Sequence, residues 1–224
     1  MRAWNRAKLL WGYLTRRARL DALPVEYIVE TTAKCNLYCP MCPRETHPQP
    51  KADMTDEVFR TLLAEAGETA EHMMLIGLGE PFMDPKIFER IEYCHQHSVS
   101  TLLSTNGTFL DERYASKVLD SPLEQITLSF DGAKKETFEF YRKGAKFEKV
   151  RDNFVRFARI KHERRSKLQI VVGSRHETAG TRPPYQPPTP AAPPEAHGRH
   201  RQVRSAWPDR QSRRAATGRC RPAR

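Results

Sequence analysis

Short apolar segments alternate along residues 21–172 with longer segments whose apolar residues recur at helical spacing. Five of them have the continuous apolar run or the strict alternation that is typical of strands, and they span residues 25–31, 73–76, 99–103, 125–128 and 168–172. Between these segments, apolar residues lie three and four positions apart, as on the buried face of an amphipathic helix. Regular alternation of strands and helices predicts a parallel sheet with helices packed outside it.

The predicted helices begin where the sequence offers capping residues. Thr55 precedes a first turn with two acidic residues, Asp111 precedes a second helix, and Asp84 and Pro85 are predicted to cap and open a third. Side-chain oxygens at such positions accept hydrogen bonds from the unpaired amides of a first helical turn. The helix after Thr55 is predicted to bury Val58, Phe59, Leu62, Leu63 and Ala66.

Residues 1–20 form a separate predicted element, a basic amphipathic helix. Its apolar residues recur at helical spacing and are Trp4, Ala7, Trp11, Leu14 and Ala18. The other positions include five arginines. This pattern favours a helix that docks on its own domain or on a partner, and contact with an anionic membrane surface is the alternative.

The composition changes abruptly after Val172. Residues 173–224 contain nine prolines, 11 arginines and three acidic residues, with no lysine, leucine, isoleucine, methionine or phenylalanine. Such a segment has too few apolar residues to offset the entropy of ordering it, so we expect a disordered tail. The loss of lysine together with the gain of arginine and proline is also what a slipped reading frame would produce.

The net charge of +11 raises the hypothesis of a basic nucleic-acid-binding protein. The tail carries +8 of this charge and residues 1–172 only +3, and the tail lacks the interleaved aromatic residues and defined motifs of nucleic-acid readers. We therefore expect no specific nucleic-acid site. No apolar run approaches membrane-spanning length and no secretory signal pattern is present, which favours a reducing, cytoplasmic location.

Three of the five cysteines lie within eight residues, directly after the first predicted strand. Cys35, Cys39 and Cys42 have the spacing C-x3-C-x2-C, and Pro40 between them indicates a loop. A structural zinc needs four protein ligands, and His47 could be the fourth, whereas a cubane iron–sulfur cluster held by three cysteines keeps one iron open. The missing fourth cysteine favours the cluster, and a non-catalytic zinc- or cluster-binding module is the alternative.

This loop resembles the cluster loop of the radical S-adenosylmethionine (radical SAM) enzymes, whose three ligand positions match Cys35, Cys39 and Cys42. The resemblance implies a [4Fe-4S] cluster whose open iron binds S-adenosylmethionine. It further implies reductive cleavage of this cofactor to a 5'-deoxyadenosyl radical, which abstracts hydrogen from an unknown substrate. An electron donor such as flavodoxin or ferredoxin is then expected. Met41 matches a position that packs beside the adenine.

Loops rich in Gly, Ser, Asn or Asp follow the second, third and fourth predicted strands, and parallel strands bring such loops to one edge of a sheet. Residues 77–81, Gly-Leu-Gly-Glu-Pro, resemble the family's Gly-Gly-Glu-Pro motif, which binds the methionine amino group, with Leu78 in place of the second glycine. The resemblance implies eight cofactor-binding residues in this region, namely Gly77, Gly79, Glu80, Ser104, Asn106, Ser129, Asp131 and Arg142.

Their implied roles differ. Ser104 and Asn106 match the strand end that contacts the ribose, and Arg142 matches an arginine that pairs with the methionine carboxylate. Ordinary turn residues and a surface charge are the alternative for Ser129, Asp131 and Arg142. The sequence offers no residue that we assign as a substrate-side acid or base.

The expected fold is α/β, a partial TIM-type (βα) barrel with about five of the six parallel strands that the resemblance implies. The predicted domains are the helix at residues 1–20, a radical SAM core at residues 21–172 and the tail at residues 173–224. We expect the sixth strand to be absent and the core to be truncated. The resemblance is to the SPASM-type maturases of peptides and natural products, and Cys94 is predicted to lie in the core rather than at the cluster.

Overall fold

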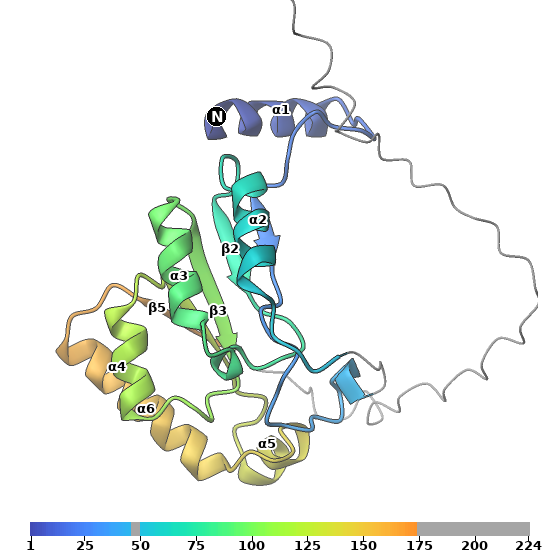
Figure 1. Cartoon of the computed structure of the whole chain (residues 1–224). Helices are drawn as coiled ribbons and strands as arrows, with labels where there is room; N and C mark the ends of the chain where they lie inside the picture. The colour runs from blue at the N-terminus through green and yellow to red at the C-terminus, as the bar shows by residue number, and fades with distance from the viewer. Residues whose placement is uncertain (46–49, 174–224) are drawn as a thin grey trace, which may run out of the picture. The chain divides into compact units, whose positions relative to one another are not determined.

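The structure is a computed structural model that describes residues 1–45 and 50–173. Its centre is one sheet of five parallel strands in the order β1-β2-β3-β4-β5 (Figure 1). The strands are β1 (Glu26–Ile28), β2 (His72–Leu75), β3 (Ser100–Thr105), β4 (Gln125–Ser129) and β5 (Gln169–Gly173). All five predicted strands are present, and β1 is shorter than the sequence pattern predicts.

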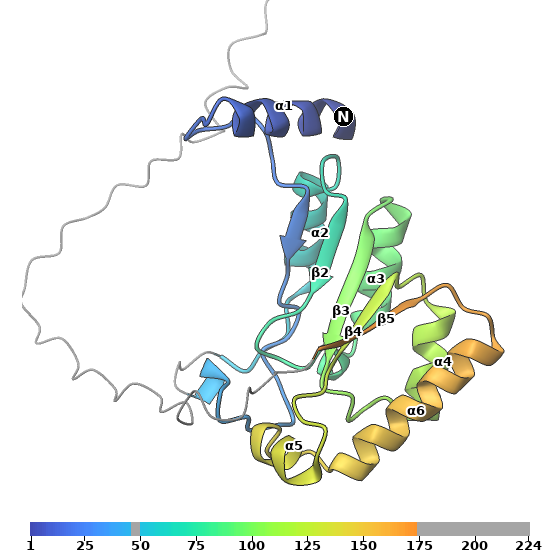
Figure 2. The same ribbon diagram turned by 180° about the vertical axis from the view of Figure 1, so that it is seen from behind.

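Four helices lie on one face of this sheet, as the two opposite views show (Figures 1 and 2). They are α2 (Asp56–Ala66), α3 (Ile87–Gln96), α4 (Glu112–Asp120) and α6 (Phe147–Glu163). The opposite face has no helix among the described residues. Its central row contains Ile28, Met74, Leu102, Gln125 and Gln169, which the strand register sets side by side.

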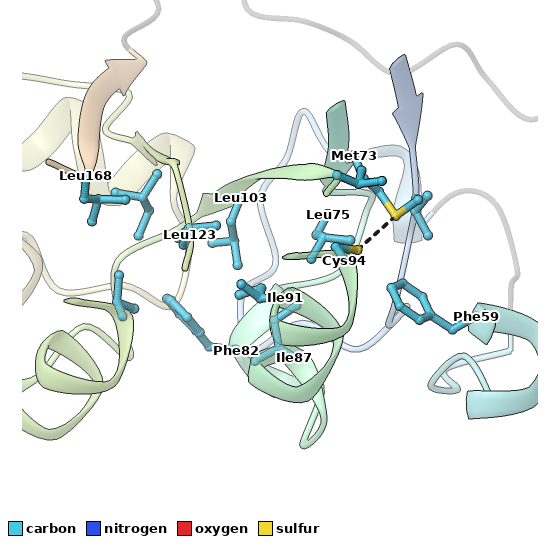
Figure 3. Packing of buried hydrophobic residues seen from close by; sticks show 14 of the residues in the cluster. Phe59, Met73, Leu75, Phe82, Ile87, Ile91, Cys94, Leu103, Leu123 and Leu168 are labelled. Atoms are coloured by element: carbon cyan, nitrogen blue, oxygen red, sulfur yellow. Dashed lines mark hydrogen bonds between the residues drawn. The ribbon is translucent and has the colours of Figure 1, made fainter. Parts of the chain in front are cut away.

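The main hydrophobic core fills the space between the sheet and these helices (Figure 3). Met73, Leu75 and Leu103 from the strands meet Ile91 of α3, and each of these side chains is at most 1% exposed. Cys94 is fully buried in the same cluster, with its sulfur 3.6 Å from that of Met73, and burial raises the pKa of its thiol to about 12. The prediction that Cys94 belongs to the core is therefore confirmed.

A second, smaller core lies beneath the cysteine loop. Leu37 and Cys39 of the loop pack with Phe138 of α5 (Lys135–Tyr141) and with Val150 of α6. The rings of Phe138 and Phe147 lie 5.7 Å apart, centroid to centroid, and extend this contact. The cysteine loop is thus packed on a hydrophobic platform contributed by the chain that follows β4.

Two local predictions are wrong in their details. The third helix begins at Ile87 with Lys86 as its N-cap, because Pro81–Met83 forms a 3-10 helix and the Asp84 carboxylate binds Arg90 at 2.9 Å. Val58 is 53% exposed, so it lies beside the buried face of α2 rather than on it. The other caps agree with the sequence, since the side chains of Thr55 and Asp111 accept hydrogen bonds from their first helical turns.

The N-terminal helix α1 (Arg2–Leu14) is present and packs at the amino ends of the strands (Figure 1). The guanidinium of Arg2 donates to the backbone carbonyls of Gly67 and His97, which precede β2 and β3. In the part of the chain that the structure describes, no helix has both the length and the apolar character needed to cross a membrane. The predictions for the tail and for a sixth strand fall outside the described residues.

Candidate functional site

A cavity of about 290 Å³ opens at the carboxyl ends of the strands, at the end of the sheet opposite α1. Its walls come from the cysteine loop and from the loops that follow β2, β3 and β4. Every site residue named from the sequence lines it, namely Cys35, Cys39, Met41, Cys42, Gly77, Gly79, Glu80, Ser104, Asn106, Ser129, Asp131 and Arg142. Residues that are up to 107 positions apart in the sequence therefore meet at one place.

The three thiols of the cysteine loop lie in partly desolvated surroundings. Burial raises the pKa of the Cys35 and Cys39 thiols, so both are protonated near neutral pH until a metal replaces the proton. The loop holds its form through backbone bonds, from Cys42 N–H to the carbonyl of Cys39 at 3.0 Å and from Tyr38 N–H to the carbonyl of Lys143 at 2.9 Å.

The spacing of the thiols distinguishes between the two inorganic centres. Within residues 1–45 and 50–173, no three His, Cys, Asp or Glu side chains converge closely enough to hold a single metal ion. In a cubane each cysteine binds a different iron, so the three ligands stand farther apart than ligands of one ion. The donor set fits a [4Fe-4S] cluster better than a structural zinc, which needs four converging ligands. His47 lies outside the described residues.

Glu80 is 2% exposed, and its carboxylate has three donors inside the protein. It accepts hydrogen bonds from the Thr105 hydroxyl at 2.6 Å, from Asn106 N–H at 2.8 Å and from Phe82 N–H at 3.4 Å. Burial nevertheless raises the pKa of Glu80 to about 7. A bound cationic group in this cavity would favour the charged carboxylate, which is the chemistry that recognition of an ammonium requires.

Gly79 is a glycine for a reason that the sequence did not indicate. We interpreted Gly77 and Gly79 as positions where the backbone approaches a ligand. A side chain at Gly79 would instead collide with the carbonyl oxygen of Thr32 and lie 2.9 Å from that of Lys34. The next amide, Glu80 N–H, donates to the Lys34 carbonyl at 2.7 Å, so the glycine loop lies directly against the backbone that leads into the cysteine loop.

Glu30, at the end of β1, is a functional residue that sequence reasoning missed. Its carboxylate accepts hydrogen bonds from Leu78 N–H at 2.5 Å and from Gly79 N–H at 3.3 Å, and its side chain fills the space beside Gly77. It therefore holds the backbone of the glycine loop in place. An acidic residue at a strand end, before a loop whose neighbour has unpaired amides, was the available signal.

Asn106 has a different role from the one expected. Its side-chain amide donates to the Asn36 side chain at 2.9 Å, and its oxygen accepts from Thr108 N–H at 2.9 Å. Asn36 also donates to the Thr108 hydroxyl at 2.9 Å. These bonds tie the cysteine loop to the loop after β3, and they occupy the side chain that we expected to contact a ribose. Ser104 lies 3.3 Å from Ser129, hydroxyl to hydroxyl, at the same edge.

Asp131 and Arg142 form an ion pair of 2.5 Å beside the cavity, with side chains 9% and 18% exposed. The alternative of an ordinary surface charge is therefore wrong for Arg142. Arg44 is a second residue that the sequence analysis missed. It is buried, and its guanidinium donates to the carbonyls of Leu37 at 2.5 Å and Cys35 at 3.4 Å, inside the cysteine loop.

Comparison with known proteins decides what this site belongs to. Residues 29–179, about two thirds of the chain, match the radical SAM superfamily. The chain belongs to the radical SAM superfamily. The cofactors of this superfamily are a [4Fe-4S] cluster and S-adenosylmethionine, and the predictions of fold class, superfamily and cofactors are confirmed.

Among curated radical SAM relatives, an AdoMet-dependent heme synthase of Methanosarcina barkeri is 29% identical over 114 residues, which are 50% of this chain and 33% of the relative. The mycofactocin maturase MftC of Mycobacterium ulcerans is 27% identical over 128 residues, 57% of this chain and 34% of the relative. The chain thus spans about a third of the length of these relatives.

Solved radical SAM structures match the fold. The structure of anSMEcpe with bound AdoMet has a TM-score of 0.53 at 25% identity, covering 67% of this chain and 43% of that one. Streptococcus suis SuiB bound to its precursor peptide SuiA has a TM-score of 0.56 at 18% identity, covering 77% of this chain and 38% of that one. At that identity SuiB supports the fold alone.

Proposed function

We propose that this chain is the catalytic core of a radical SAM enzyme, with Cys35, Cys39 and Cys42 as the ligands of the [4Fe-4S] cluster. One observation carries the proposal: the cysteine loop and all the residues expected to bind S-adenosylmethionine line a single cavity at the carboxyl edge of the sheet. When bound, the reduced cluster and S-adenosylmethionine supply a 5'-deoxyadenosyl radical, which abstracts hydrogen from the substrate.

The protein's own groups bind and orient the cofactor. We assign Glu80 to the methionine ammonium group, because its buried carboxylate faces a cavity and gains charge when a cation is near. We assign Arg142, held by Asp131, to the methionine carboxylate. The hydroxyls of Ser104 and Ser129 are the polar groups placed for the ribose, and Met41 is the apolar group placed for the adenine.

We further propose that the substrate is a peptide or another natural product and that a flavodoxin or ferredoxin supplies the electron. The support for this substrate class is the similarity to relatives named as maturases. An oxygen-sensitive cluster also fits a reducing, cytoplasmic setting. The substrate itself depends on parts of the protein beyond the conserved cofactor site.

The deciding experiment is anaerobic reconstitution followed by reduction in the presence of S-adenosylmethionine. We expect about four irons and four sulfides per chain and the release of 5'-deoxyadenosine, which liquid chromatography would quantify. One zinc per chain without sulfide would instead support the non-catalytic module. Iron loading without any 5'-deoxyadenosine would contradict the proposed reaction.

Glu30 gives a further prediction, because it acts through the glycine loop rather than on the cluster. Replacing it by alanine leaves two loop amides without their acceptor, so we expect S-adenosylmethionine to bind about tenfold more weakly. The Glu30→Gln variant keeps an oxygen acceptor and the contact with Gly77, and should bind nearly as well as the parent. Equilibrium dialysis under anaerobic conditions measures the affinity.

Iron content separates this effect from a general loss of structure. Both Glu30 variants should still load about four irons per chain, because Glu30 makes no contact with the cysteine side chains in the described residues. An unchanged affinity in Glu30→Ala, or a parallel loss of iron in both variants, would show that Glu30 does not position the loop.

A further inference from the structure

The helix α1 packs on the rest of the chain through its polar and small residues. Asn5 is buried and exchanges two hydrogen bonds with the backbone of Leu23, at 2.8 Å and 3.0 Å. Gly12 is also buried, because the side chain of Leu20 covers it. Arg2 donates to two backbone carbonyls, and Arg6 forms an ion pair with Glu71. The docked face is therefore not the apolar face that the sequence pattern suggested.

The apolar face of α1 points the other way. At 3.6 residues per turn, five apolar positions fall within about 120° of the helix circumference, on the side away from Asn5 and Gly12. Trp4 is 69% exposed and Trp11 is 59% exposed, although tryptophan is usually well covered in a folded domain. We call this set the outer face of α1, and it consists of Trp4, Ala7, Leu10, Trp11 and Leu14.

Positive charge surrounds the outer face. Residues 1–20 contain six basic residues and no acidic residue. Glu71 and backbone carbonyls pair with Arg6 and Arg2, but Arg16, Arg17 and Arg19 directly after the helix are all exposed. Exposed tryptophans beside lysine and arginine are the combination that settles at the boundary between lipid headgroups and acyl chains, where anionic lipids attract the basic groups.

We propose that the outer face of α1 binds the surface of a membrane that contains anionic phospholipids, with the rings of Trp4 and Trp11 at headgroup depth. The charge of this segment selects a negatively charged surface, and the width of the apolar stripe suits a helix lying in the plane of the interface. This contact is independent of the cofactor site, because α1 lies at the amino ends of the strands and the cavity at their carboxyl ends.

The test is flotation of the full chain with lipid vesicles. The parent chain should float with vesicles of phosphatidylcholine and phosphatidylserine, and should not float with phosphatidylcholine alone. We expect the double variant Trp4→Ala, Trp11→Ala to lose about tenfold or more of the vesicle-bound fraction. Both side chains are exposed, so their removal should leave the fold intact. Added salt should weaken the binding of the parent chain.

Two controls distinguish the outer face from other sources of binding. The basic tail is present in every variant, so it cannot cause a difference between them. The matched variant Phe140→Ala, Val155→Ala removes two exposed apolar side chains far from α1 in sequence and should bind like the parent. Tryptophan fluorescence should shift to the blue on vesicle binding, and this shift should vanish in the tryptophan double variant, which keeps only Trp207.

Three outcomes would overturn the proposal. The first is no difference in flotation between vesicles with and without phosphatidylserine. The second is undiminished binding by the tryptophan double variant. The third is a dimer on size-exclusion chromatography that the double variant loses while the parent ignores vesicles, because this result would assign the outer face to a second copy of the chain.

Discussion

Replacing Cys35, Cys39 or Cys42 by serine is expected to reduce the iron content of the reconstituted protein from about four irons per chain to less than about one, and to reduce 5'-deoxyadenosine to background. Each thiolate would hold a different iron, and a hydroxyl is a poor substitute for a thiolate at iron. All three residues line the same cavity, so the loss of any one should have the same effect. Iron and sulfide assays with the visible absorption of the cluster measure the result.

Cys94 provides the matched control. It is fully buried against Met73 in the main core and lies outside the cavity lining. The Cys94→Ala variant should lose some stability, because it removes a packed sulfur, yet should load about four irons like the parent. Full iron loading in any of the three loop variants, or a loss of iron confined to Cys94→Ala, would refute the assigned ligand set.

Replacing Gly79 by alanine is expected to destabilise the protein by about 3 kcal/mol and to prevent cofactor loading. The added methyl group would meet two backbone carbonyl oxygens, those of Thr32 and Lys34, and neither can rotate away as a side chain would. Accommodating it requires the glycine loop to separate from the chain that enters the cysteine loop. Urea unfolding of the parent and the variant measures the change in the free energy of unfolding.

Gly173 is the matched control for this prediction. At the end of β5, an added methyl group would lie 3.6 Å from the nearest atom, which is ordinary van der Waals contact. The Gly173→Ala variant should therefore unfold within about 0.5 kcal/mol of the parent. Equal stability and normal iron loading in Gly79→Ala would show that the two loops need not touch.

The sequence was sufficient to predict the strands, most helices and the residues that meet at the cavity, because those features depend on local periodicity and on the position of loops after parallel strands. It was not sufficient for interactions between distant segments. Glu30 contacts amides 48 and 49 residues away, and nothing in the local pattern identifies that partner. Arg44 was missed for a similar reason, since its acceptors are backbone carbonyls that any sequence would supply.

The helix α1 illustrates another limit of pattern analysis. Periodicity correctly indicated a helix with an apolar stripe, but an apolar stripe does not specify whether the chain's own domain covers it. Trp4 and Trp11 remain outside, whereas the buried positions are Asn5 and Gly12. Specific hydrogen bonds from Asn5 and ion pairing by Arg6 determine the docked face here, and neither contributes to a hydrophobic period.

The bond from Glu80 N–H to the carbonyl of Lys34 has a practical consequence for engineering. It joins two main chains, so no side-chain exchange at Leu78 or Lys34 removes it. Chimeras with other members of the superfamily should therefore transplant residues 30–44 and 77–81 as one unit. A graft of either segment alone would pair surfaces that were selected in different proteins.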